Sequence, residues 1–251
     1  MSWLNLGIFL GALVVAGLAV HLVHKHWSPE KRREHTDVAG FIFAGVAVLY
    51  AVMLAFVVIV GWEGLGSARA TTYREADQLA NVYWTSRHLP PPQGPATASL
   101  AVAYAHTVIG TEWPLMNQGE SSPKAQAILN QTRDRVFVYQ PRTGQQQALY
   151  GQALGNVNDL SAARRDRLAS MNETVPEPLW VALIVGGLIT VAFCLLFGLE
   201  NQAVHIAMVV GIAALITISL LLVKDMQHPY AGDPHISPES FKIFLENVQP
   251  R

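Results

Sequence analysis

The sequence predicts an all-α membrane protein with four transmembrane helices and a helical extramembrane domain inserted between helices 2 and 3. Four stretches contain no Asp, Glu, Lys or Arg: residues 1–24, 38–62, 178–199 and 201–223. Each has at least 22 residues, and about 20 helical residues cross the hydrocarbon layer of a bilayer. Charged residues make up only 14% of the chain, against about 25% in ordinary soluble domains.

The four stretches divide the chain into four expected segments. The first stretch lacks Lys and Arg near Met1 and is long for a signal sequence, so we expect a retained helix. The segments are residues 1–63 (helices 1 and 2 with a short basic link), 64–177 (the helical extramembrane domain), 178–224 (the transmembrane hairpin of helices 3 and 4) and 225–251 (a tail with a short amphipathic helix).

Local signals predict where the first two helices begin and end. We expect helix 1 over residues 4–23 and helix 2 from Val38, with Asp37 as its N-cap. Helix 2 is expected to continue into water, because apolar residues keep a helical period up to Tyr83. Glycines at 61, 64 and 66 favour a bend, and the proline-rich residues 89–95 end the segment.

Three helices are predicted in the inserted domain, over residues 96–116, 124–139 and 145–171. Ser122 suits the N-cap of the second, although residues 136–139 also fit a short strand. The transmembrane hairpin is expected to turn at residues 200–202, with Glu200 and Asn201 capping its helices.

The tail carries the signals of one further short helix. Ser237 is its expected cap and Pro238 its first residue. Its apolar stripe would face the domain, a neighbouring subunit or the membrane surface; the stripe consists of Phe241, Phe244, Leu245 and Val248.

The motifs of common enzymes and nucleotide-binding proteins are missing from the sequence. It contains no HExxH, CxxC, GxSxG or P-loop pattern, and the single cysteine, Cys194, cannot form an intrachain disulfide. We therefore expect no enzyme activity, no cofactor and no nucleic-acid partner. Four histidines gather around the first link and fit either a metal site or polar residues at the membrane interface: His21, His24, His26 and His35.

The predicted spans hold few ionisable side chains beyond His21 and His205. Ion-coupled transporters normally need intramembrane acids or bases, so the sequence favours a channel or a protein that transports nothing. Glu63, at the end of helix 2, would form a ring of carboxylates in an oligomer, or is a single solvated charge. Arg164, Arg165 and Arg167 fit a rim that attracts anions, or a face that pairs with the domain's acids.

The orientation in the membrane is left open by the charges. The first link carries Lys25, Lys31, Arg32 and Arg33, which favours a cytoplasmic link and an external domain. The opposite flanks carry more Lys and Arg, but long loops follow this rule poorly. With four spans, both termini lie on the domain's side of the membrane.

The order of several segments resembles the bacterial bestrophin-like domain family, whose members show a distant likeness to bestrophin ion channels. The similar segments are residues 49–58 with 62–63, residues 74–79, Glu112-Trp113-Pro114, residues 160–165 with 167–168, residues 197–201, and residues 229–232 with 236–238 and 241. Their order extends over residues 38–245.

This resemblance implies a homo-oligomeric ion channel, pentameric as bestrophins are, in the bacterial inner membrane with a cytoplasmic domain. Its partners would be the lipid bilayer and inorganic ions. The apolar face of helix 2 carries Leu49, Met53, Phe56 and Val60. This face would either line the pore or pack on helices 1, 3 and 4. The alternative is a non-conducting scaffold or sensor whose helical domain binds a partner. The resemblance does not imply calcium gating, because no calcium-ligand cluster is evident.

Overall fold

The computed structural model describes residues 3–33, 36–171, 175–232 and 235–248. Within these residues the secondary structure is helical and contains no strand. The predicted all-α fold is confirmed, and the short strand considered at residues 136–139 is not formed. Contacts divide the chain into two compact units, Met1–Glu63 with Thr174–Gln227 and Gly64–Glu173 with His228–Arg251.

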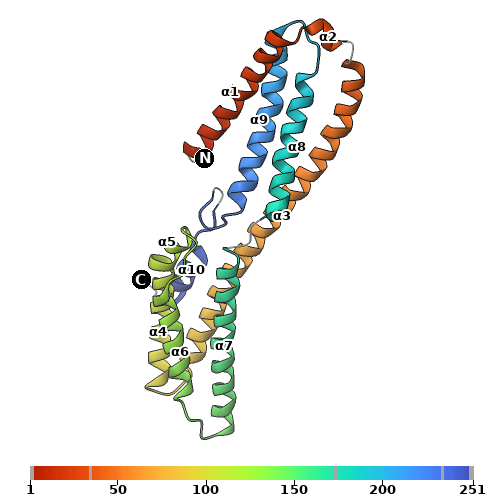
Figure 1. Cartoon of the computed structure of the whole chain (residues 1–251). Helices are drawn as coiled ribbons and strands as arrows, with labels where there is room; N and C mark the ends of the chain where they lie inside the picture. Colours follow the sequence, from red (N-terminus) through yellow and green to blue (C-terminus); the bar gives the residue numbers. More distant parts are fainter. Residues whose placement is uncertain (1–2, 34–35, 172–174, 233–234, 249–251) are drawn as a thin grey trace. The chain divides into compact units, whose positions relative to one another are not determined.

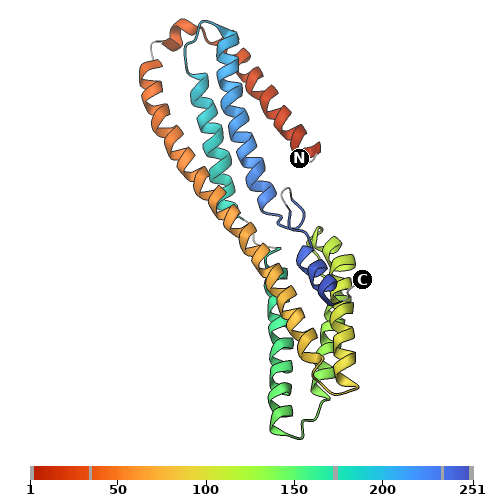
Figure 2. The same cartoon turned by 180° about the vertical axis from the view of Figure 1, so that it is seen from behind.

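The first unit is a bundle of long apolar helices. It contains α1 (Trp3–His26), the short α2 (Pro29–Arg33), the first part of α3 (Thr36–Ser86), α8 (Glu177–Leu195) and α9 (Gln202–Met226). Both views show α9 between α1 and α8, with α8 between α9 and α3 (Figures 1 and 2). Each of the four long helices is long and apolar enough to cross a membrane, as the uncharged stretches predicted.

Two apolar clusters hold this bundle together. Val20 of α1 packs with Cys194 of α8 and Val209 of α9 in the first cluster. Val57 of α3 packs with Leu183 of α8 in the second. Large apolar side chains also cover the outside of every span, which is the pattern of helices whose outer surface meets lipid or another chain rather than water.

The ends of these helices differ from the predicted ones in two places. Helix α8 ends at Leu195, so the turn to α9 occupies residues 196–201 rather than 200–202. Asn201 caps α9 as expected, because its Oδ1 accepts hydrogen bonds from the N–H groups of Ala203 and Val204. Helix α3 begins at Thr36, so Asp37 lies in its first turn and not at the N-cap position.

Helix α3 runs without interruption over 51 residues, Thr36–Ser86. The predicted continuation of helix 2 beyond Glu63 is therefore confirmed, and the glycines at 61, 64 and 66 do not end the helix. Gly61 has a packing reason for its small size, because a Cβ there would lie 3.3 Å from the Met226 sulfur.

The second unit is a helical domain built around the remainder of α3. It adds α4 (Gln93–Thr107), the π-helical turn η1 (Val108–Glu112), α5 (Trp113–Met116), α6 (Pro123–Phe137), α7 (Gly144–Ala169) and α10 (Glu239–Val248) (Figure 1). Side-chain caps start two of these helices: Ser122 accepts from the Ala125 N–H and Thr143 from the Gln146 N–H. The predicted Ser122 cap is confirmed.

Helix α4 begins inside the residues that were expected to be a breaker. Gly94 lies in its first turn, where a Cβ would come within 2.3 Å of the Leu89 carbonyl oxygen. Glycine lets the chain reverse tightly at this point, so the connection from α3 is shorter than the prolines suggested.

The tail belongs to the domain's core. Helix α10 begins at Glu239, one residue after the predicted position. Phe241 and Phe244 are buried among the domain's apolar residues, and Leu245 and Val248 pack against the same cluster. Of the three surfaces that the apolar stripe could face, it therefore faces the domain.

Candidate functional site

The first candidate site is the outer surface of the membrane-spanning part of α3. Of the predicted pore residues, Leu49, Phe56 and Val60 expose 74%, 63% and 55% of their surface, and Glu63 is also exposed. Met53 instead packs in the bundle's second apolar cluster with Val57 and Leu183. Whether the exposed residues line a pore stays a prediction.

Close packing against α8 fixes which side of α3 faces inward. Tyr50 is buried and its ring lies over two glycines of α8, so that a Cβ at Gly186 would be 2.8 Å from Tyr50 Cδ2. Val57, two turns further along α3, is buried on the same side. The side of the helix opposite these two residues therefore faces away from the chain's own bundle.

The centre of that outer surface lies beside the predicted residues. Successive helical residues are separated by about 100°. Ile59 and Val52 therefore point roughly opposite to Val57, whereas Phe56 points about 100° away from it. Val48, Val52 and Ile59 are all exposed. The sequence could not identify this line of residues, because α3 is apolar all round and shows no preferred face until its neighbours are placed.

The second candidate site, the arginine cluster on α7, is buried inside the domain. Arg167 Nε lies 2.6 Å from Glu75 Oε2, and the Arg167 guanidinium also bonds Glu112. Arg164 Nη2 lies 2.6 Å from the other oxygen of Glu112. Two arginines and two carboxylates thus neutralise one another in the domain's interior.

A rim that attracts anions needs exposed guanidinium groups, and this cluster provides few. Arg164 and Arg167 are buried and paired, so their geometry fits the second interpretation, pairing with the domain's acids. Arg165 is the exposed member of the three.

The π-helical turn η1 places Glu112 in this cluster. Pro114 has no N–H, so the preceding turn cannot continue as a regular α-helix. The Trp113 N–H donates to the Val108 carbonyl five residues earlier, which widens the turn. The Glu112 carboxylate also accepts from the Ser122 N–H at 3.2 Å.

The cluster shifts the pKa values of its members in opposite directions. Burial raises the pKa of Glu112, but the Arg167 and Arg164 guanidinium groups outweigh burial and hold that pKa below its ordinary value of 4.5. Burial and the neighbouring Glu75 carboxylate raise the pKa of Tyr104 well above 10.0, and the Tyr104 hydroxyl donates to Glu75 at 2.7 Å. These shifts keep the carboxylate charged and the phenol neutral near pH 7.

The third candidate site lies at the end of the bundle that carries the α8–α9 turn. Side chains from four elements bond the backbone of this turn and its flanks. His24 Nε2 lies 3.2 Å from Leu199 O, Arg32 Nη1 lies 2.9 Å from Phe197 O, Thr36 Oγ1 accepts from Gly198 N at 3.2 Å, and His205 Nε2 lies 2.9 Å from Cys194 O.

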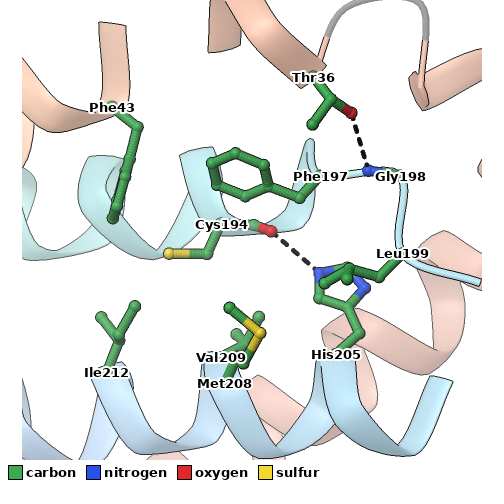
Figure 3. A pocket seen from close by; sticks show the side chains of 10 residues that line it. All are labelled: Thr36, Phe43, Cys194, Phe197, Gly198, Leu199, His205, Met208, Val209 and Ile212. Carbon is green, nitrogen blue, oxygen red and sulfur yellow. Dashed lines mark hydrogen bonds between the residues drawn. The ribbon is translucent and has the colours of Figure 1, made fainter. Parts of the chain in front are cut away.

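Beside this turn is an apolar cavity of about 260 Å³, shown in Figure 3. Phe43 and Phe197 face Ile212 and Met208 across it, and His205 lies at one end with one ring nitrogen directed at the Cys194 carbonyl. Thr36 Oγ1 and His205 Nε2 bond to the chain's own backbone, and the other side chains labelled in Figure 3 are mostly apolar, so the cavity offers a largely apolar surface.

The described histidines do not form a metal centre. Within residues 3–33, 36–171, 175–232 and 235–248, no group of three or more His, Cys, Asp or Glu side chains is placed to hold a metal ion. His35, the fourth member of the predicted group, lies outside the described residues. His205 comes close to His24, with ring centroids 5.1 Å apart, although the two are far apart in the sequence.

Comparisons with known proteins cover almost the whole chain. The sequence profile of the Bestrophin-like domain matches residues 11–241. A crystal structure of a bacterial bestrophin homologue from Klebsiella pneumoniae, in a variant form, has a TM-score of 0.72 at 13% identity and covers 97% of this chain and 99% of that chain. The zinc-phased structure from the same organism has a TM-score of 0.69 at 14% identity, covering 95% of this chain and 96% of that chain. At these identities the similarity establishes a shared fold. No curated protein sequence matches the chain.

Proposed function

Because the chain belongs to the bestrophin-like domain family, we propose that it is an oligomeric ion channel whose α3 helices surround the pore. The observation that carries the proposal is the exposed apolar surface of α3. The surface opposite Tyr50 and Val57 is uncharged over the membrane-spanning residues, and the large apolar side chains along it are exposed in the single chain. A symmetric assembly, pentameric as in bestrophins, would bring these side chains together as successive rings.

A narrow apolar ring controls ion flow through its hydration. Water leaves such a constriction easily, and ions do not cross it when it is dry. The side of α3 that faces the symmetry axis of the assembly decides which residues form the rings. If that side is the edge of the outer surface, the rings consist of Phe56, Val60 and Leu49. If it is the centre of the outer surface, they consist of Ile59 and Val52. At the end of this surface, Glu63 would add one carboxylate per subunit, which favours cations.

Flux into liposomes tests the proposal. Phe56→Ser and Ile59→Ser each make one ring polar, and a hydrated ring lets ions pass. The variant whose residue forms the narrowest ring should therefore show an ion flux about tenfold or more above that of wild type. Leu188→Ser is the matched control, since Leu188 is an equally exposed apolar residue on α8. If wild type shows no ion flux and both serine variants behave like the control, the channel proposal is wrong. The scaffold or sensor alternative would then stand.

We place the domain and both termini on the cytoplasmic side of the bacterial inner membrane. The family likeness supports this side, and two contacts weaken the opposing charge argument. Arg32 is buried against carbonyl groups of the α8–α9 turn, and Arg33 Nη1 lies 2.8 Å from Glu200 Oε1. Two of the four Lys and Arg residues of the basic link are thus bonded to groups at this end of the bundle. A C-terminal fluorescent-protein fusion should fluoresce in cells, whereas an active C-terminal alkaline phosphatase fusion would reverse the orientation.

A further inference from the structure

An apolar groove of about 490 Å³ lies on the membrane-spanning bundle between α1 and α8. Helix α9 forms its floor, in agreement with the position of α9 between these two helices in Figures 1 and 2. On the α1 side the groove is lined by small side chains, among them Ala12, Ala16 and Ala19. On the α8 side the lining side chains are larger and include Leu188 and Val191. Three spans therefore build the groove together.

The groove follows the direction of the spans and lies largely within their middle turns. It is lined by residues 12–19 of α1 and 213–220 of α9, all at least six residues from either end of their helix. On α8 it extends over residues 184–195, as far as the end of that helix. The middle turns of a span lie at the depth of the lipid hydrocarbon. The groove is therefore open to the layer that the lipid chains occupy.

The lining of the groove offers no free hydrogen-bonding side chain. Thr217 is the one lining residue with a polar side chain, and its hydroxyl donates to the Ala213 carbonyl oxygen at 2.7 Å. A polar or charged molecule would lose its hydrogen bonds to water in such a place and gain none. The occupant that fits the groove is therefore apolar.

The width of the groove separates two apolar occupants, a helix of another chain and a lipid chain. The 11 steps from residue 184 to residue 195 of α8 span about 16 Å, so the mean cross-section of the groove is about 30 Å². A helix with its side chains is about 10 Å wide and has a cross-section of about 80 Å². A whole helix does not fit, whereas a thin flexible chain does.

We propose that this groove binds an acyl chain of a membrane phospholipid. A chain in the groove is contacted by α1, α8 and α9 at once, so it makes more dispersion contacts than a chain that lies on the outer side of a single helix. Because only the acyl chain enters the groove, the headgroup has little influence on binding. The proposal rests on the bundle alone and does not depend on ion conduction.

Native mass spectrometry of the full-length protein tests the site after transfer from phospholipid nanodiscs into detergent, because it counts retained lipids and subunits together. Wild type should retain about one phospholipid per chain, from phosphatidylglycerol or phosphatidylcholine with the same acyl chains. Ala12→Phe and Ala19→Phe place a ring in the groove and should lower retention about fivefold or more. Ala207→Phe is the matched control, because Ala207 is an exposed alanine of α9 outside the groove. It should follow wild type.

Three results of this experiment would overturn the proposal. The first is wild-type protein without retained phospholipid, and the second is equal retention in the two groove variants and the control. The third is a changed number of subunits in the groove variants with unchanged lipid retention, because side chains of another copy would then occupy the groove.

Photochemical labelling of wild type tests the site without a variant. A phosphatidylcholine with a diazirine midway along its acyl chain is added, and loosely held lipid is removed with detergent before illumination. Labelling should be about fivefold or more higher at the groove residues of α1 than at Leu10 and Leu18, which are exposed on the same helix and do not line the groove. Equal labelling of the two sides of α1 would also overturn the proposal.

Discussion

Tyr50 of α3 lies so close to Gly186 of α8 that a single added carbon would meet the edge of its ring. The Cβ of any larger residue at position 186 would be 2.8 Å from Tyr50 Cδ2 and 3.2 Å from Met53 Cε. This contact turns one side of α3 toward the bundle and leaves the other side free.

Gly186→Val should therefore loosen the attachment of α3. Overpacking of a filled interior costs about 1–3 kcal/mol, which lowers the Tm of a protein of this size by roughly 3–10 °C. Gly211→Val is the control, because a Cβ at Gly211 meets nothing within 4 Å. Thermal unfolding in detergent measures both, and equal Tm values would show that α3 can shift to accept the larger side chain.

Arg167→Met should unfold the domain far more readily than Arg165→Met. The first change leaves the buried carboxylates of Glu75 and Glu112 without their shared partner, and breaking a buried ion pair costs about 3–5 kcal/mol. Arg165 is exposed on the same helix, so its loss should change stability by less than about 0.5 kcal/mol. Denaturant unfolding compares the two, and similar losses would mean that the cluster contributes nothing specific.

Acid should weaken the domain through Glu112. Its pKa in the folded protein is held below 4.5 by Arg167 and Arg164, so the stabilisation is complete above pH 4.5 and is lost as the pH falls through the lowered pKa. Thermal unfolding between pH 6 and pH 3 should show a decline in Tm. Glu112→Gln should be less stable at pH 6 and should have a flatter acid profile. An unchanged slope in this variant would assign the acid sensitivity to other groups.

Phe241→Ala should release the tail helix from the domain. Phe241 is fully buried, and the guanidinium carbon of Arg167 lies 5.9 Å from the centre of its ring. Removing a buried phenylalanine side chain costs about 3–5 kcal/mol. Ile243→Ala, on the exposed side of α10, is the control. Hydrogen exchange over residues 239–248 should increase strongly in the first variant and little in the second; a protected α10 in Phe241→Ala would contradict the proposed anchoring.

The four long apolar helices and the helical type of the inserted domain followed from local properties of the sequence, whereas the short α2 and the division of residues 93–116 into α4, η1 and α5 did not. A run of more than 20 residues without fixed charge has few stable locations other than lipid, and Ser122 and Asn201 cap helices through bonds to their immediate neighbours. The turn between α8 and α9 was misplaced because Gly198 packs against distant backbone. A Cβ there would lie 2.6 Å from the Arg33 nitrogen, and such a contact leaves no local signal.

The candidate sites were predicted less completely, because they depend on residues that are far apart in the chain. Arg167 and Glu75 are separated by 92 positions and His24 and Leu199 by 175. The sequence identified the arginines as charged residues on a helix but could not show that buried carboxylates neutralise two of them. It likewise identified α3 as an apolar helix without showing which side packs inward.

By itself, the sequence determined that this is a four-span helical membrane protein with an inserted domain, because hydrophobic length and capping act within a few turns of helix. The tertiary structure alone decided that Met53 faces the bundle while Phe56 and Ile59 face outward, and that Arg167 is a buried partner of Glu75. Those outcomes depend on close packing and on charge neutralisation away from water, and both arise only when distant segments meet.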